Sequence, residues 1–474
     1  MTELYRRKPR QWDIRALVPL AAGLLWLTSL DGFGWWLWAL LPGVVLVAAG
    51  CSQLLWPGDH RIPQFMAAGS LVGVLFAIPA LFSGEWLCVL LSAALSAASF
   101  LNAGALAREQ MVLPEGVTIG PGWRNDAKIA LDDALLAYFR GTAMLPSDSK
   151  ADLVCDELIE AQALLKLRGW ISKPTIAHQA PEPPVHQSVE RRRIYGRDYE
   201  VLRFASGFET DQEMPGAERW QSYTANQRTC AWVMRHPGRE RPWLMGIHGY
   251  RMGMPWLDFS LFDPRWIHDH LGFNLILPVL PLHGPRRAGW RSGDEYLDGD
   301  FMDVYHAQSQ ALWDLRQTLA LLRQQEDAPR IGVMGFSLGG YNAALLAQHD
   351  ANLDFVVAGI PLTDIAAALW HNIPPAHAAY YQHRGATEAL FREVLRPVSP
   401  LAAAPKIHRD HLHIFAGTAD RLVPPAEVMK LSEHWQVPVD WFDGAHLTFR
   451  GEPAVSRTLR SAAERAGWRL PKAS

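Results

Sequence analysis

Residues 331–341 read IGVMGFSLGGY and decide how the second half of the chain folds. An apolar run of strand length, Ile331–Met334, leads into Gly335-Phe336-Ser337-Leu338-Gly339, and a helical pattern follows over Gly339–Gln348. A serine between a strand and a helix, with a glycine on either side, predicts a sharp turn that holds its hydroxyl above the edge of a sheet. The glycines avoid a collision of Cβ atoms where the strand meets the helix.

A nucleophilic serine requires a base, and the base requires an acid that orients it. The stretch HLHIFAGTADRLVPP (411–425) contains a strand pattern that ends at Ala416 and places Asp420 in the following loop. The stretch VPVDWFDGAHLTF (437–449) ends a last strand at Phe442 and places His446 in the next loop. Ser337, Asp420 and His446 are therefore predicted to be the nucleophile, acid and base. Asp364, after the strand that follows the elbow, is an alternative acid.

Acyl transfer also needs two hydrogen-bond donors directed at the oxyanion that develops on the carbonyl. The first predicted donor is the backbone N–H of Leu338, the residue after the nucleophile. The stretch WLMGIHGYRMG (243–253) reads as a strand followed by a His-Gly turn. We expect the second donor in this turn, from the N–H of Tyr250 with Gly249 as its neighbour.

These motifs, taken in chain order over about residues 190–470, resemble the α/β-hydrolase family. The resemblance implies a mostly parallel sheet covered by helices, with a cap inserted around residues 360–401. The GFSLGGYNAA elbow, the DGAHLTF ending and the loop PVLPLHGPRR (278–287) are also similar, more distantly, to the α/β-hydrolase domain-containing protein 18 group. Members of that group are associated with the deacylation of membrane lipids.

The loop 278–287 supplies candidate substrate-binding residues. His283, Arg286 and Arg287 are predicted to bind an anionic head group, because guanidinium groups suit phosphate and carboxylate. The alternative is that they form structural ion pairs with Asp294 or Glu295. The cap carries aromatic residues that fit either an apolar acyl pocket or the cap's own core, namely Trp370, Tyr380, Tyr381 and Phe391.

The first quarter of the chain has a different composition. From Ala16 to Ala107 the charged residues are Asp31, Asp59, Arg61 and Glu85. They separate four apolar runs, Ala16–Leu30, Phe33–Trp56, Gln64–Phe82 and Trp86–Ala107. The last three runs meet the length of roughly 20 residues that crosses a bilayer, whereas the first is short and contains a proline. We therefore expect a membrane region with about four transmembrane helices over residues 1–107.

The distribution of Lys and Arg predicts the orientation in the membrane. Several basic residues precede the first run, namely Arg6, Arg7, Lys8, Arg10 and Arg15, and Arg61 lies in the second loop. With four spans, the positive side holds both the N-terminus and everything after Ala107. This predicts an integral protein of the cell membrane with its catalytic domain facing the cytoplasm. Three spans would reverse that placement.

The rest of the chain divides by pattern. Residues 108–187 are expected to form a helical connector, with helical patterns at Ala127–Phe139 and Ala151–Leu167 and a proline-rich linker at Lys173–Gln187. Residues 188–474 are expected to form the catalytic domain. The 45 Lys and Arg nearly balance the 48 Asp and Glu, which argues against a nucleic-acid partner. No Cys or His spacing indicates a metal, and no cofactor is predicted.

Together these features predict a membrane-anchored serine hydrolase that cleaves carboxylic esters of lipids or other acyl compounds. A triad defines the mechanism and not the leaving group, so a peptidase or thioesterase is an alternative. A membrane assembly protein with a silent hydrolase-like domain is a second alternative. The complete set of triad and oxyanion candidates weighs against it.

Overall fold

The computed structural model describes residues 13–143, 146–237, 241–297, 300–326, 328 and 330–471. The chain divides into two compact units. The helical unit comprises Met1–Ala143, Gly417–Ala426 and Trp441–Glu452, and the sheet unit comprises Met144–Ala416, Glu427–Asp440 and Pro453–Ser474. The division at Ala143 falls inside the predicted connector, so that segment contributes to both units.

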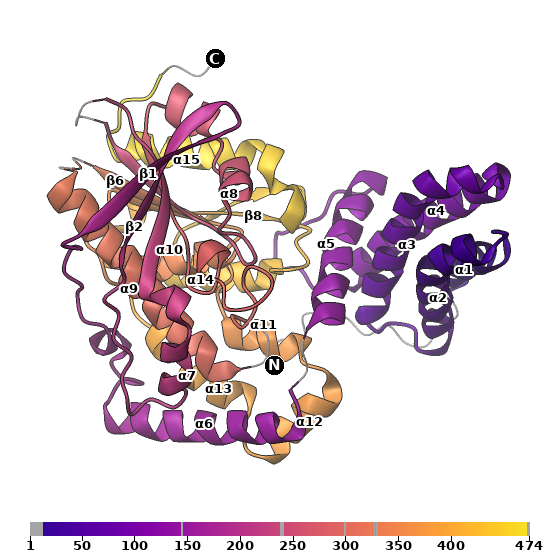
Figure 1. Ribbon diagram of the computed structural model, residues 1–474, viewed down its shortest axis with the longest axis horizontal. Coiled ribbons are helices and arrows are strands. Elements are labelled where there is room, and N and C mark those ends of the chain that lie inside the picture. Colours follow the sequence, from indigo (N-terminus) through magenta and orange to yellow (C-terminus); the bar gives the residue numbers. More distant parts are fainter. Residues whose placement is uncertain are drawn as a thin grey trace. The chain divides into compact units, whose positions relative to one another are not determined.

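The N-terminal part of the helical unit is built from five helices (Figure 1): α1 (Leu17–Thr28), α2 (Phe33–Leu55), α3 (Arg61–Ala80), α4 (Trp86–Gln110) and α5 (Trp123–Thr142). Among the described residues, three helical stretches are long and apolar enough to cross a membrane, by length and composition: Phe33–Leu55, Arg61–Ser83 and Trp86–Gln110. The first apolar run forms a shorter helix, Ile14–Thr28. The basic residues Arg6, Arg7, Lys8 and Arg10 lie outside the described residues. The number of spans, and with it the orientation, stays a prediction.

Small residues allow α5 to pack closely on the apolar helices. A Cβ at Gly104 of α4 would collide with the Asp126 carbonyl of α5. Ala130 and Ala134 of α5 belong to a buried cluster that also contains Ala49, Met66, Ala67, Ala103 and Leu106. Close approach through alanine and glycine is the usual way in which helices associate inside a bilayer. Here the same type of packing fixes α5, which is more polar, to α3 and α4.

Within the described residues, nine strands form one sheet in the order β1-β2-β3-β5-β4-β6-β7-β8-β9. The strands are β1 (Gln187–Ile194), β2 (Arg197–Ala205), β3 (Arg228–Met234), β4 (Trp243–Ile247), β5 (Asn274–Pro278), β6 (Ile331–Phe336), β7 (Phe355–Gly359), β8 (Leu412–Gly417) and β9 (Val439–Phe442). Pairing is antiparallel from β1 to β5 and parallel from β5 through β4, β6 and β7 to β8. The predicted mostly parallel sheet is thus confirmed.

Helices cover the parallel strands, as expected for strands that are apolar on both faces. α10 (Leu338–Ala347) packs on β4, β6 and β7, and α15 (Pro453–Arg465) packs on β7. The other helices that follow α5 outside the predicted cap are α6 (Asp148–Leu167), α7 (Ala217–Ser222), α8 (Pro255–Leu261), α9 (Phe301–Gln325) and α14 (Pro425–Trp435). The sequence pattern missed β1. Seven of its eight residues are exposed, so it has no buried face to produce an alternating pattern.

The segment predicted as a cap folds into three helices, α11 (Ile365–Asn372), α12 (Pro375–His383) and α13 (Glu388–Val394). Tyr381 and Phe391 are buried and pack on Phe301 of α9, with ring centroids 5.5 and 4.3 Å apart from it. α13 also packs against α6. These two aromatic residues therefore belong to the core of the segment.

Candidate active site

The predicted elbow forms between β6 and α10. Ser337 has φ 58° and ψ −115°, in the left-handed region that few non-glycine residues occupy. Its N–H donates to the Gly359 carbonyl at 3.0 Å, and its carbonyl accepts from the Tyr341 N–H at 3.0 Å. Ser337 is half-buried while its sequence neighbours are buried. The strained turn thus brings one side chain out of an otherwise closed core.

The glycines of the elbow are required by close contacts between backbones. A Cβ at Gly335 would collide with the Gly339 carbonyl, and a Cβ at Gly339 would collide with the Ile247 carbonyl of β4. These contacts give the physical reason for glycine at both positions of the motif.

The His-Gly turn after β4 lies beside the elbow. A Cβ at Gly249 would be 3.6 Å from the Ser337 Cβ, and Leu338 is the first residue of α10. The Leu280 N–H donates to His248 Nε2 at 3.0 Å, so Nδ1 carries the proton and donates to the Gly249 carbonyl at 2.8 Å. Burial lowers the pKa of His248, which keeps the ring neutral in this role. The sheet unit therefore brings Ser337, Leu338 and Gly249 together.

The predicted base and acid form a direct pair in the helical unit. His446 Nδ1 donates to Asp420 Oδ2 at 2.6 Å. The other oxygen of Asp420 accepts from the N–H groups of Leu422 and Val423 at 2.9 and 2.8 Å. Burial alone lowers the pKa of His446, but the charge and hydrogen bond of Asp420 raise it above its ordinary value. This is the arrangement of an imidazole prepared to accept a proton on Nε2.

The alternative acid has other partners. Asp364 caps the first turn of α11 and accepts a hydrogen bond from Arg392 Nε at 2.8 Å. His446 instead has Asp420 as its carboxylate partner. Among the described residues, no group of three or more His, Cys, Asp or Glu side chains is placed to hold a metal ion.

A further carboxylate, for which the sequence predicts no role, contacts both the loop of the predicted acid and the loop of the predicted base. Asp132 of α5 accepts hydrogen bonds through Oδ2 from the N–H groups of Arg421 and His446, at 3.1 and 2.8 Å. Its Oδ1 accepts from the N–H of Leu447 at 3.0 Å. The Asp132 side chain is fully buried. One residue of α5 thus joins the loop of the acid to the loop of the base.

The neighbouring Asp133 supports the same loop through a buried ion pair. Arg421 Nε donates to Asp133 Oδ1 at 2.9 Å, and both side chains are 0% exposed. Burial raises the pKa of Asp133, while the charge of Arg421 opposes that shift. Both aspartates sit on α5 three or four residues from the buried Ile129 and Leu136. Two acidic residues on the apolar face of a helix are the sequence feature that could have indicated buried, partnered carboxylates at these positions.

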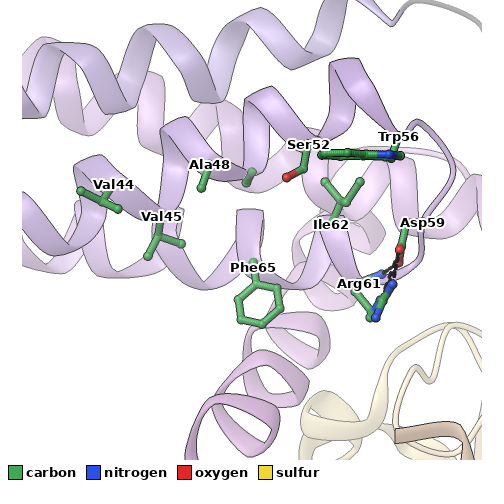
Figure 2. Close-up of a pocket in the computed structure, with 10 residues that line it drawn as sticks. Val44, Val45, Ala48, Ser52, Trp56, Asp59, Arg61, Ile62 and Phe65 are labelled. Atoms are coloured by element: carbon green, nitrogen blue, oxygen red, sulfur yellow. Dashed lines mark hydrogen bonds and ion pairs between the residues drawn. The ribbon is translucent and has the colours of Figure 1, made fainter. Parts of the chain in front are cut away.

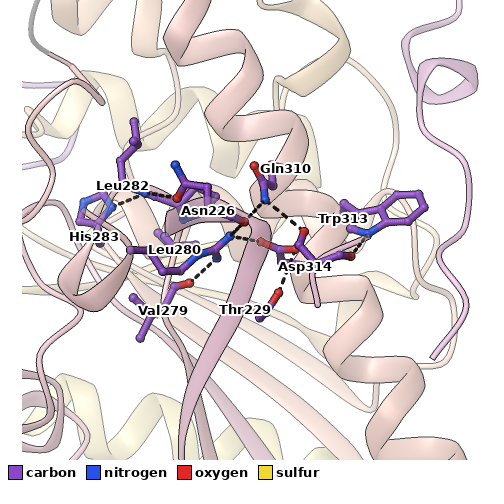
Figure 3. A network of polar contacts seen from close by, with 12 residues as sticks. Asn226, Thr229, Val279, Leu280, Leu282, His283, Gln310, Trp313 and Asp314 are labelled. Carbon is purple, nitrogen blue, oxygen red and sulfur yellow. Dashed lines mark hydrogen bonds and ion pairs between the residues drawn. The ribbon is translucent and has the colours of Figure 1, made fainter. Parts of the chain in front are cut away.

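The structure corrects the predicted substrate-binding role of Arg286. Its side chain is 2% exposed, and Nη2 donates to Asp314 Oδ2 at 2.7 Å. Nη1 donates to the Val279 carbonyl at 2.8 Å. Figure 3 shows Asn226, Thr229, Gln310 and Asp314 converging on this buried polar network. The guanidinium is therefore engaged by acceptors inside the protein.

His283 is likewise unsuited to an anionic head group. The residue is fully buried, and its Nδ1 donates to the Pro281 carbonyl at 2.8 Å. Burial lowers the pKa of His283 well below its ordinary value, so the ring carries no positive charge at neutral pH. Arg287 is exposed and is the member of the predicted trio that solvent reaches.

A cavity of about 590 Å³ lies in the helical unit, between α2 and α3 (Figure 2). Its lining is mostly apolar, with the ion pair of Asp59 and Arg61 near Trp56 at one end. The lining contains none of the predicted site residues. The cavity is therefore a feature of the apolar helices and not of the predicted triad.

Solved structures with similar chain traces include acetyl xylan esterase 1 from Thermoanaerobacterium sp. JW/SL YS485. It is 15% identical, with 69% of this chain and 98% of that chain covered and a TM-score of 0.42. An acylaminoacyl peptidase from Pyrococcus horikoshii is 14% identical, with 61% and 43% of the two chains covered and a TM-score of 0.36.

Residues 312–443 match the prolyl oligopeptidase family, Peptidase_S9. The matched range contains the Ser337 elbow and Asp420 and ends just before His446. This family match, together with the parallel sheet and the strand–serine–helix turn after β6, identifies the protein as a hydrolase with the α/β-hydrolase fold.

Two relatives from Mycobacterium tuberculosis are similar over most of their length. The uncharacterized protein MT2702 of strain CDC 1551 / Oshkosh is 38% identical over 302 residues, which cover 63% of this chain and 72% of the relative. The uncharacterized protein Rv2627c of strain ATCC 25618 / H37Rv is 37% identical over 302 residues, with the same coverage. The chain belongs to the family of these two mycobacterial proteins.

Proposed function

We propose that the protein is a membrane-anchored serine hydrolase that cleaves carboxylic esters, with lipids or other acyl compounds as substrates. The observation that carries the proposal is the buried pair of His446 Nδ1 and Asp420 Oδ2, 2.6 Å apart, in a chain that also has a serine elbow. Since β6, β7 and β8 run parallel, Ser337 and Asp420 both follow the carboxyl ends of their strands. In α/β sheets, ligands bind outside those ends.

The proposed reaction has two halves. Ser337 Oγ attacks the ester carbonyl while His446 Nε2 takes its proton, and Asp420 holds the imidazole in the correct tautomer. The bond to the leaving oxygen breaks, His446 protonates the released alcohol, and an acyl-serine remains. Water then adds by the same route and releases the carboxylic acid. The N–H groups of Leu338 and of Tyr250, beside Gly249, stabilise the oxyanion in both halves.

The membrane assignment rests on the three long apolar helices of the helical unit. Anchoring keeps the enzyme close to substrates that partition into a bilayer. We further propose the cell membrane and a catalytic domain on the cytoplasmic side, from the placement of Lys and Arg in a four-span arrangement. A reporter fused to the C-terminus tests the orientation, and an external signal would overturn it.

A peptidase on the same triad is the second candidate, because residues 312–443 match the prolyl oligopeptidase family. The two candidates share every step up to the leaving group, which is an alcohol from an ester and an amine from a peptide. Chromogenic esters, thioesters and peptide amides assayed side by side separate them. Exclusive cleavage of amides would overturn the ester assignment.

The decisive experiment is labelling of the full-length protein in detergent with a fluorophosphonate probe, which reacts with activated serines. We expect labelling of the parent protein, its loss in Ser337→Ala, and a fall in ester hydrolysis of about 10⁴-fold or more. Ser456→Ala is the matched control, because Ser456 is half-buried, as Ser337 is, and its Oγ donates to the Pro453 carbonyl. Labelling that persists in Ser337→Ala would exclude Ser337 as the nucleophile.

A further inference from the structure

Asp132 is a buried acid of the helical unit that contacts the loops of both the predicted acid and the predicted base. Its two carboxylate oxygens accept three backbone hydrogen bonds, two of them from residues of the loop that carries the base, His446 and Leu447, and one from Arg421. Arg421 directly follows the acid Asp420. The hydrogen bonds connect Asp132 to residues 289 to 315 positions away in the chain. A side chain of α5 thus fixes the main chain on both sides of the His446–Asp420 pair.

We propose that Asp132 is a positioning residue of the catalytic pair, which holds the His446 and Asp420 loops at a fixed separation and supports the protonated imidazole with its negative charge. The proposal rests on the function proposed above and deepens it. It makes α5, a helix outside the predicted catalytic domain, part of the machinery of the site.

The first part of the argument is geometric. Three N–H donors converge on one carboxylate, which accepts and does not donate when it is ionised. An asparagine has the same size but offers one oxygen, so its amide N–H₂ would face at least one of these donors. Displacing a catalytic group by about 1 Å can cost about a hundredfold in rate. We therefore expect the rate of the reaction to fall when the Asp132 carboxylate is replaced by an amide.

The second part is electrostatic. The carboxylates that act on His446 are Asp420, from the loop after β8, and Asp132, from α5. The positive charges of Arg421 and Arg140 act on Asp133, the other acid of this region. On balance the pKa of Asp132 is raised to about 7, because burial and the charge of Asp420 outweigh the lowering by His446 and the backbone N–H groups. Two carboxylates around one imidazole favour its protonated form, which is the form that arises during the reaction.

The position of α5 is fixed by its packing against the apolar helices α2, α3 and α4. Ala130 and Ala134, two residues on either side of Asp132, pack into the buried cluster formed with α2, α3 and α4. Ile129 packs with Ala419, the residue before the catalytic acid. The apolar helices thus serve as the support on which the two catalytic loops are held.

The test compares Asp132→Asn with Asp126→Asn in the full-length protein in detergent. Asp126 lies on the same helix and pairs with Arg108 of α4 at 2.8 Å, so it is a matched acid. For Asp132→Asn we expect kcat to fall about tenfold to a hundredfold with KM changed less than about twofold. For Asp126→Asn we expect both parameters to stay within about twofold of the parent.

The pH profile separates positioning from a general loss of folding. Loss of a nearby negative charge destabilises the imidazolium, so the acid limb of the kcat/KM profile should move to lower pH in Asp132→Asn. The pKa of His446, measured by ¹⁵N-histidine NMR and assigned through His446→Gln, should move in the same direction. Asp132→Glu retains the charge and should move the limb back toward the parent position. A limb that stays in place in Asp132→Asn would overturn the electrostatic role.

Two measurements on the parent protein test the proposal without any variant of Asp132. If the Asp132 variants do not fold, hydrogen exchange of the parent protein still tests the bridge, since the amides of Arg421, His446 and Leu447 should be protected. Rapid exchange of these amides would overturn the positioning role. Fluorophosphonate labelling of the parent tests the proposed function separately. A parent that does not label refutes the hydrolase, whereas the NMR titration of His446 still reports on Asp132.

Discussion

The turn that carries Ser337 is held by its own backbone, whereas the loops that carry Asp420 and His446 are held by a remote side chain. In the first region, the strand, the serine and the helix are consecutive, and the contacts that shape the turn join main-chain atoms of β4, β6, β7 and α10. In the second region, the main chain of both loops is fixed by Asp132, 289 to 315 residues earlier in the chain. The first arrangement is local, and the second depends on a helix elsewhere.

The two units in which these regions lie also contain comparable buried ion pairs. Arg421 pairs with Asp133 in the helical unit, and Arg286 pairs with Asp314 in the sheet unit. All four side chains are at most 3% exposed. Each pair ties a loop that follows a strand to a helix, α5 in one case and α9 in the other. Buried pairs of this kind do more to fix a geometry than to add stability, because desolvation offsets much of their attraction.

The largest effect is expected from a substitution in the turn that carries Ser337. In Gly335→Ala the new Cβ meets the Gly339 carbonyl, so the elbow cannot form and fluorophosphonate labelling of Ser337 should be lost together with thermal stability. Gly141→Ala is the control, because a Cβ at that position meets no atom within 4 Å apart from its chain neighbours and the nearby backbone of its own helix. Labelling and thermal unfolding measure both effects. A Gly335→Ala protein that labels at the parent rate would show that the turn does not require the glycine.

A smaller effect is expected from the acid of the second region. In Asp420→Asn the amide cannot accept the Nδ1 proton of His446 in the same way, so the imidazole loses its correct tautomer and kcat should fall about 10⁴-fold. Asp364→Asn should leave kcat within about twofold, since Asp364 caps α11 and pairs with Arg392. Steady-state ester hydrolysis measures both. The reverse pattern would make Asp364 the catalytic acid.

The smallest effect on catalysis is expected from the loop after β5. Arg286→Ala leaves Asp314 buried without its partner and should lower the free energy of unfolding by about 3–5 kcal/mol. Arg287→Ala, on the same loop but exposed, should change it by less than about 0.5 kcal/mol. Urea unfolding followed by tryptophan fluorescence measures the difference. Equal stabilities for the two variants would contradict the structural role of Arg286, and an increase in KM for Arg287→Ala would support its predicted contact with substrate.

Most of the fold could be predicted from the sequence because its signals are local. The strands around the site, such as Ile331–Phe336, are short apolar runs bounded by turn residues, and their predicted positions agree with the structure within one or two residues. The apolar helices were equally clear from their lack of charge. β1 was missed because an exposed edge strand has no buried face and therefore no periodic pattern.

The site could be predicted in part. The pairing of His446 with Asp420 followed from their positions after the last two strands. The predicted substrate-binding roles of His283 and Arg286 do not agree with the structure, in which both side chains are buried. A basic loop next to a sheet edge looks the same in sequence whether its cations face solvent or a buried acid. The partner of Arg286, Asp314, lies on α9, 28 residues away, and nothing in the loop itself indicates that pairing.

The sequence alone determined the chemistry that we propose for this chain, because the serine elbow, the predicted acid and the predicted base each lie within a short motif whose residues must be close in the chain. The tertiary structure decided what holds those groups in place. Asp132 and Asp133 read as two charges on an amphipathic connector until packing buries them against Arg421 and the loop of His446. Backbone geometry over a few residues is encoded locally, whereas the burial of a charge depends on segments that only folding brings together.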